Sequence, residues 1–146
     1  MKEMREDDCQ AFLGGRRFGV MSLARQGDAY GLPLFYAYDG YAIFFHSRPG
    51  EKDGFLEQTN EGCFVVVEVR SDDDWTSVEA RGPVSRVATN ADADRAFKAI
   101  SNNPFPPEFG IDVRGKPKRS GAESYLWMMK PEKITGRTSR SLVRSK

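Results

Sequence analysis

Apolar and polar residues alternate with a period of two along much of the chain, which is the pattern of half-buried β-strands. Aromatic and β-branched residues dominate these runs, while Gly, Pro, Asn and Asp separate them. The segment 62–70 (GCFVVVEVR) is nearly continuous in apolar residues, which indicates a strand buried on both faces. The segments predicted as strands are 17–23, 31–38, 41–47, 62–70, 75–87 and 124–129.

Short polar segments predict the turns and helices between these strands. Asp39-Gly40 lies between two aromatic-rich runs and predicts a two-residue hairpin. Gly82-Pro83 interrupts the longest strand and predicts a bulge or a bend. Three short helices are predicted, at residues 7–13 with Asp7 as N-cap, at 51–58, and at 91–100 with Asn90 as N-cap. An irregular, basic loop is expected to follow over 108–122.

The order of these elements predicts a mainly β fold, a six-stranded antiparallel barrel with a few helices covering its open ends. Strands follow one another without intervening helices, so a Rossmann nucleotide-binding fold is not expected. A chain of 146 residues predicts one domain, here residues 1–136. Residues 130–138 are expected to lead into a basic, flexible C-terminal tail at 137–146.

Charge and hydropathy limit the kinds of binding partner that we expect for this protein. Residues 1–73 carry 8 basic and 13 acidic side chains, a net of −5, whereas residues 74–146 carry 14 and 8, a net of +6. Nucleic acid would demand a denser basic face than this and is not expected as a partner. The apolar runs fall far short of the roughly 20 residues of a membrane helix, and the acidic start MKEMREDDCQ does not resemble a secretory signal. A soluble, cytoplasmic protein is therefore expected.

The sequence contains few residues for metal or nucleophilic chemistry. Two distant cysteines and one histidine do not predict a disulfide framework, and they disfavour zinc. Neither a GxSxG nucleophile motif nor a P-loop occurs. Haem remains open, because one axial histidine suffices.

The segment 46–52 (HSRPGEK) is the best candidate for an anion site. A strand is expected to end at Ser47 and a helix to begin near Glu51, so free backbone N–H groups would lie beside Lys52. His46 is open to two interpretations, a packed strand-end histidine or a titrating group that contacts a ligand. Trp75 and Trp127 are expected to pack in the core, with ligand stacking as the alternative.

Several segments, taken in order, resemble a known family. They are RFGVMSL, GLPLFYAYDGYAIFFHSRPGEK, GCFVVVEV, WTSVEARGPVSRV and a late KPEKITGRTS. This order resembles the pyridoxamine 5′-phosphate oxidase-like flavoproteins, the FMN-binding split barrels, and within them the nitroimidazole-resistance group most of all. The resemblance covers about residues 5–139. The C-terminal arginine-rich substrate segment of the true pyridoxamine-phosphate oxidases has no clear counterpart here.

The resemblance implies a homodimer with FMN at its interface. It assigns ring contacts to the first two strands, contacts along the ribityl chain to the third, and the phosphate to Lys52. The second subunit would contribute Trp75 and the residues up to Val78, together with Trp127. The implied cofactor-binding residues are Val20, Met21, Ser22, Pro33, Leu34, Phe45, His46, Ser47, Lys52 and Trp75.

The function implied by the resemblance is an FMN-dependent oxidoreductase. Hydride would pass from a nicotinamide or another donor to a small acceptor, for example a nitro compound, with His46 as the catalytic residue that orients or protonates the acceptor. The alternative is a non-catalytic split-barrel protein that binds flavin or haem. No metal site is predicted.

Overall fold

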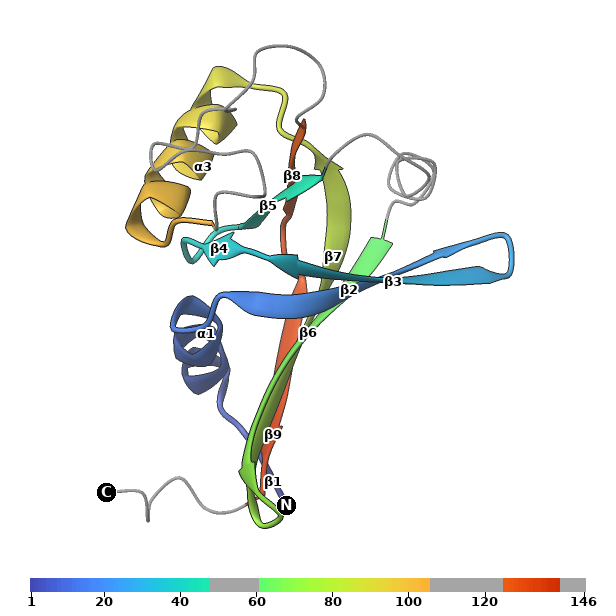
Figure 1. Cartoon of the computed structure of the whole chain (residues 1–146), viewed down its shortest axis with the longest axis vertical. Helices are drawn as coiled ribbons and strands as arrows, with labels where there is room; N and C mark the ends of the chain where they lie inside the picture. The colour runs from blue at the N-terminus through green and yellow to red at the C-terminus, as the bar shows by residue number, and fades with distance from the viewer. Residues whose placement is uncertain (48–60, 106–124, 140–146) are drawn as a thin grey trace.

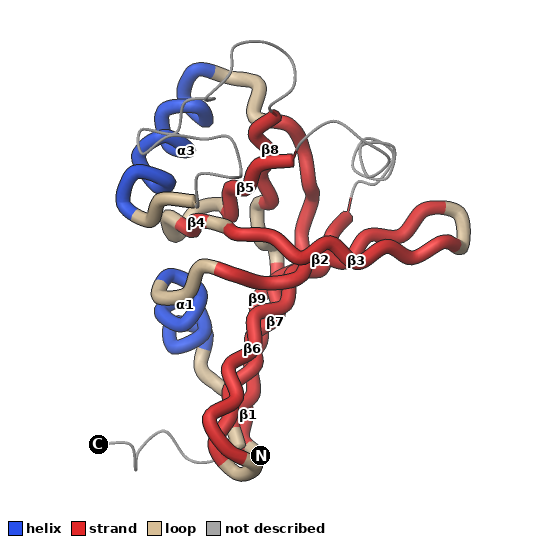
Figure 2. The backbone as a smooth tube through the Cα atoms, in the orientation of Figure 1, coloured by secondary structure: helices blue, strands red, loops and turns tan. Residues whose placement is uncertain are grey.

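The computed structural model describes residues 1–47, 61–105 and 125–139. Within these ranges two α-helices and nine strands occur, and every strand pairing is antiparallel (Figure 1, Figure 2). The helices are α1 (Glu6–Gly14) and α3 (Asn90–Asn102). The strands are β1 (Lys2–Glu3), β2 (Phe18–Arg25), β3 (Asp28–Phe35), β4 (Ala37–Tyr38), β5 (Ile43–Ser47), β6 (Glu61–Ser71), β7 (Asp74–Arg86), β8 (Tyr125–Met129) and β9 (Lys133–Thr138).

The sheet runs in the order β3-β2-β6-β7-β8-β5-β4, and β9 pairs with both β7 and β1. Strand β7 changes partners along its length: it pairs with β9 up to Arg81, with β6 up to Pro83, and with β8 from Val84 onward. A Cβ atom at Gly82 would collide with the carbonyl group of Lys130, so only glycine fits this crossing. The mainly β, antiparallel architecture predicted from the sequence is confirmed.

Two apolar clusters fill the molecule. The barrel core lies inside the curved sheet and is closed by the buried face of α1, which contributes Cys9, Phe12 and Leu13. The second cluster, here called the α3 layer, lies between α3 and the outer side of β4, β5 and β8. Its members include Phe44, Ile100 and Met128. Strand β5 therefore has both faces covered, since Phe45 points into the barrel core and Phe44 into the α3 layer.

Local hydrogen bonds move several of the expected boundaries. Thr89, not Asn90, caps α3, because its side chain accepts the backbone N–H of Asp92 at 3.1 Å. The turn between β4 and β5 has four residues instead of two, because Tyr38 pairs with Ile43. Asp39 Oδ1 accepts the backbone N–H groups of Tyr41 and Ala42, both at 2.9 Å, and so holds the wider turn.

Two further expectations at the chain ends are wrong. Asp7 does not cap α1, because the helix begins at Glu6 and the Asp7 carboxylate instead accepts a hydrogen bond from Arg5 at 3.0 Å. Arg137 and Thr138 belong to β9 rather than to a tail, because β9 is paired on both edges, with β7 and with β1. The helix predicted at 51–58 and the loop at 108–122 lie outside the described residues.

Candidate functional site

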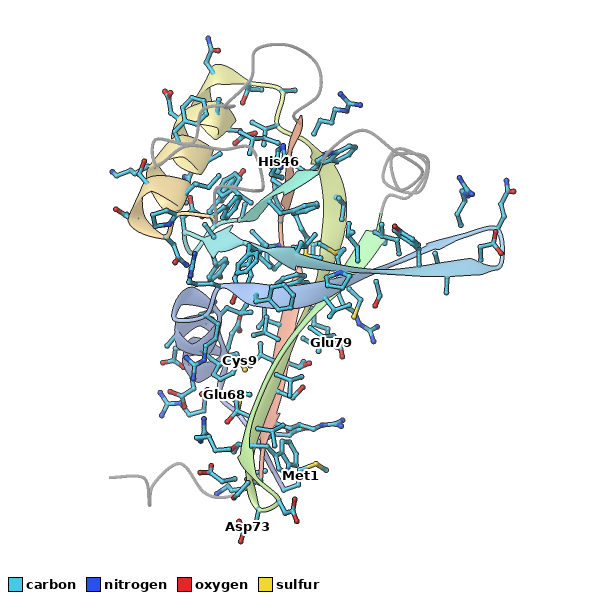
Figure 3. The ribbon with its side chains drawn as sticks, in the orientation of Figure 1. Met1, Cys9, His46, Glu68, Asp73 and Glu79 are labelled. Carbon is cyan, nitrogen blue, oxygen red and sulfur yellow. The ribbon has the colours of Figure 1, made fainter. Side chains whose placement is uncertain are left out.

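One broad face of the sheet has no helix over it. Helix α1 packs on the inner side of these strands, and α3 covers the outer side of β4, β5 and β8 instead (Figure 1). Figure 3 shows Glu79 on the uncovered side, whereas Cys9 and Glu68 lie on the side of α1. We call this surface the open face. Direct cross-strand partners share a face, and the register places there Val20, Ser22, Gly31, Pro33, Cys63, Val65, Val67, Val69, Trp75, Ser77, Glu79, Arg81, Lys133, Thr135 and Arg137.

The β2–β3 end of the open face is flat and weakly polar. Val20 is the direct partner of Pro33 on one side and of Val65 on the other. Ser22 likewise faces Gly31. All of these side chains are short, and Val20 is 38% exposed. Such a surface suits a planar, largely apolar ring better than a charged ligand.

Gly31 is the residue here that packing among the described residues does not explain. It lies inside strand β3, where glycine is unfavourable because it adds backbone entropy and no contacts. A Cβ atom at Gly31 would meet, among the described residues, only Val20 Cγ1, at 3.9 Å. By contrast, a Cβ at Gly19 would lie 2.6 Å from the ring of Phe64. Glycine within a strand often marks the close approach of a ligand or another backbone, so Gly31 points outward to something that covers the open face.

The β7–β9 end of the open face is charged. Glu79 accepts a hydrogen bond from Arg81 Nε at 2.5 Å, and both line a cavity of about 430 Å³ that also includes Lys133 and Arg137. Neighbouring Cys63 is half-buried, and burial, reinforced by Glu79, raises the pKa of its thiol. The Cys63 thiol therefore stays protonated near neutral pH and is a poor nucleophile.

The structure brings together only part of the predicted site. Val20, Ser22 and Pro33 lie side by side on the open face. Trp75 lies on the same face, at the start of β7. The side chains of Met21, Leu34 and Phe45 instead lie in the barrel core, so only the main chain of Met21 and Leu34 could contact a ligand on the open face. Sequence reasoning missed Gly31, although a glycine inside an apolar strand was the available signal.

His46 lies away from this group. It is 6% exposed, and it occupies the face of β5 that Phe44 shares, toward the α3 layer (Figure 3). This burial agrees with the packing interpretation of His46, and its catalytic role stays a prediction. Ser47 ends β5, and Lys52 lies outside the described residues.

Trp127 is buried in the barrel core opposite Phe45, with the Arg86 guanidinium 5.1 Å from its ring centre. Its Nε1–H has no hydrogen-bond acceptor within the described parts of the chain. A buried donor of this kind is uncommon and is often satisfied by a ligand or water.

An antiparallel split barrel with one uncovered sheet face defines the class of this protein. The sequence matches the model of the pyridoxamine 5′-phosphate oxidase family over residues 5–138, and the chain belongs to that family. The FAD-binding protein of Mycobacterium smegmatis has a similar structure, with a TM-score of 0.73 and 18% identity over 95% of this chain and 100% of the other. An FAD-binding protein of Mesorhizobium loti gives 0.72 and 20%, covering 94% and 95%.

One further solved structure and one curated protein are also similar to this chain. A Bacteroides thetaiotaomicron protein named for 5-nitroimidazole antibiotic resistance gives a TM-score of 0.67 at 16% identity, covering 92% of this chain and 86% of the other. An uncharacterized protein of Rhizobium meliloti is 23% identical over 82 residues, which are 56% of this chain and 54% of that protein. The match thus spans about half the length of the curated relative. In the described residues, neither helix has the length and apolar character needed to cross a membrane.

Proposed function

We propose that this protein binds FMN against the β2–β3 end of the open face and acts as a flavin-dependent oxidoreductase on a small acceptor such as a nitro compound. The observation that carries the proposal is the uncovered patch of Val20, Ser22, Gly31 and Pro33, with its otherwise unexplained glycine. Family membership supports it, as do the names of the similar proteins, two of which bind FAD.

The residues present fit a flavin. The isoalloxazine ring is flat and apolar on its faces, and Gly31 leaves room for it to lie directly against the β3 main chain. The phosphate would bind Lys52, as the resemblance to the family implies.

A bound flavin supplies reversible hydride and electron transfer. The part played by this chain is to hold the ring in one orientation and to keep water from one side of it. Val20 and Pro33 would contact the apolar ring, while Ser22 offers a hydroxyl to its polar edge. Rigid strands suit this role because they fix these groups more precisely than loops would.

We further propose that a second copy of this chain covers the open face. Val67 and Val69 are 54% and 67% exposed there, and nothing else in the described chain packs over them. A symmetric dimer is the commonest way to bury such a surface. Trp75 of one copy would then lie near the flavin of the other.

Flavin titration of Gly31→Leu tests the proposal. Leucine at this position has room among the residues that the structure describes, so the fold should survive, but the side chain would occupy the space of the ring. We expect wild-type apoprotein to quench the fluorescence of one equivalent of FMN and the variant to bind at least about tenfold more weakly. Ser85→Leu, a serine exposed on β7 beyond the open face, is the matched control and should bind like wild type.

Three outcomes contradict the assignment. Equal FMN affinity of wild type and Gly31→Leu would remove the ring from this patch. Binding of FAD but not FMN would change the cofactor. A Soret band in the purified protein, without flavin, would favour the haem-binding alternative.

A further inference from the structure

A polar groove lies between the C-terminal end of α1, the β4–β5 turn and α3. Two adjoining hollows form it, of about 560 Å³ and 310 Å³, and they share Asp39, Ala99 and Asn102. The first is also lined by Arg95 and Lys98, and the second by Arg17, Tyr38 and Asn103. The groove shares no residue with the open face.

The guanidinium of Arg95 forms one wall of the groove, and two contacts hold it in place. Arg95 lies over the ring of Tyr41, with its Cζ atom 4.1 Å from the ring centre. Its Nη1 donates to Asp39 Oδ2 at 3.1 Å. A planar fork fixed in this way loses little conformational entropy when it binds a ligand, and its other N–H donors remain for that ligand.

A second guanidinium is fixed in the same manner further along the groove. Arg17 lies 5.5 Å from the centre of the Phe35 ring and donates from Nη2 to the carbonyl oxygen of Pro104. It uses one of its five donors in this contact. The groove thus contains two preorganised arginine forks.

The charges of the groove are unbalanced. Asp39 is its one carboxylate among the described lining residues, and its two oxygens already accept three hydrogen bonds, from Tyr41, Ala42 and Arg95. Arg17 and Lys98 have no ion-pair partner in the parts of the chain that the structure describes. Donors therefore outnumber acceptors, which is the composition of a site for an anion.

We propose that this groove binds a small organic anion with separated carboxylate or phosphate groups. Arg17 and Arg95 hold one anionic group each, and Lys98 and the Asn102 amide add donors between them. The site lies apart from the flavin face, so it would act as an independent binding site for a substrate, product or effector.

Calorimetric titration with two probes, inorganic pyrophosphate and citrate, at constant ionic strength tests the proposal. We expect one equivalent of at least one probe to bind per chain. Arg17→Gln and Lys98→Gln should each weaken binding by about tenfold, the loss of one charge-assisted hydrogen bond. Arg95→Lys keeps the charge but removes the fork, and it should also weaken binding. Lys133→Gln, which removes a lysine of the open face, is the control.

The two probes separate the chemistries, since binding of pyrophosphate alone indicates a phosphate ester and binding of citrate alone a polycarboxylate. Absence of heat with both probes would overturn the proposal. An equal loss of binding in Lys133→Gln would also overturn it, because binding would then follow overall charge. Thermal melting of each variant distinguishes loss of the site from loss of the fold, and FMN affinity should be unchanged in the three groove variants, Arg17→Gln, Lys98→Gln and Arg95→Lys.

Discussion

Tyr36 joins the barrel core to the first helix through one buried hydrogen bond. Its side chain is fully buried, and its hydroxyl donates to the carbonyl oxygen of Leu13 at 2.6 Å. That carbonyl lies in the last turn of α1, where helix carbonyls have no partner within the helix. Tyr36 therefore anchors the C-terminal end of the helix to the sheet.

We expect Tyr36→Phe to lower the free energy of unfolding by about 1–1.5 kcal/mol at neutral pH, because the Leu13 carbonyl loses its short hydrogen bond and keeps only the longer one from the Arg16 N–H, at 3.4 Å. Burial also raises the pKa of Tyr36. The native state then holds the phenol proton more tightly than the unfolded state, so wild-type stability falls once the pH rises above the ordinary tyrosine value of about 10. Urea titrations from pH 7 to about 11 should show the two proteins converging. A constant difference would exclude this titration.

Side-chain alternation was sufficient to predict which residues share a face, but not what covers each face. Alternation separates Phe45 from His46, whereas the resemblance groups Met21 with Val20 and Ser22 although the Met21 side chain lies in the barrel core. It cannot show that α3 packs over Phe44 while Val20 stays 38% exposed within the described chain, because those contacts join distant segments. Gly31 was missed for the same reason, since its significance depends on the empty space around it.

At the scale of elements, α3 begins at a single side-chain cap. Thr89 Oγ1 accepts the Asp92 N–H at 3.1 Å, and the carbonyl oxygen of Thr89 accepts the N–H of Ala93 at 2.9 Å. The helix then packs Ala96, Ala99 and Ile100 against β4, β5 and β8. The cap therefore sets where this packed face starts.

Thr89→Ala should lower the free energy of unfolding by about 1 kcal/mol, because the Asp92 N–H loses its acceptor. Thr89→Ser retains the hydroxyl and should stay close to wild type. Chemical denaturation monitored by circular dichroism measures both. Equal losses in the two variants would assign the effect to the methyl group of threonine and not to the cap.

Strand existence was easier to predict than strand ends. Strands β6 and β7 are predicted from their residue patterns, whereas β9 is not predicted. Its sequence, KITGRT, is mostly polar and contains a glycine, and it becomes a strand because β1 and β7 pair with its two edges. A Cβ at Gly136 would lie 2.7 Å from Cys9 Sγ, so only glycine at this position allows α1 to pack this closely against β9. Such tertiary causes leave little trace in local sequence.

At the scale of the whole molecule, the open face predicts self-association. Val67→Lys and Val69→Lys together should shift the protein toward monomer at a given concentration, because two charges would be buried at the proposed interface. Monomer stability should change little, since both side chains are already more than half exposed. Sedimentation equilibrium measures the shift, and Ala88→Lys, exposed outside the open face, is the control. A wild-type monomer at all concentrations would contradict the prediction.

The pairing of β1 with β9 has a consequence for the order in which the chain folds during synthesis. Lys2 and Glu3 pair with Thr138 and Arg137, so β1 meets its partner only after the residues up to Thr138 have left the ribosome. Translation adds about 5–20 residues per second, and the N-terminal segment must wait several seconds for β9. Helix α1, which also packs on β9, stays without that neighbour for the same time. Nascent chains halted before Lys133 should therefore be cleaved by protease near α1, and release of the full chain should protect that helix.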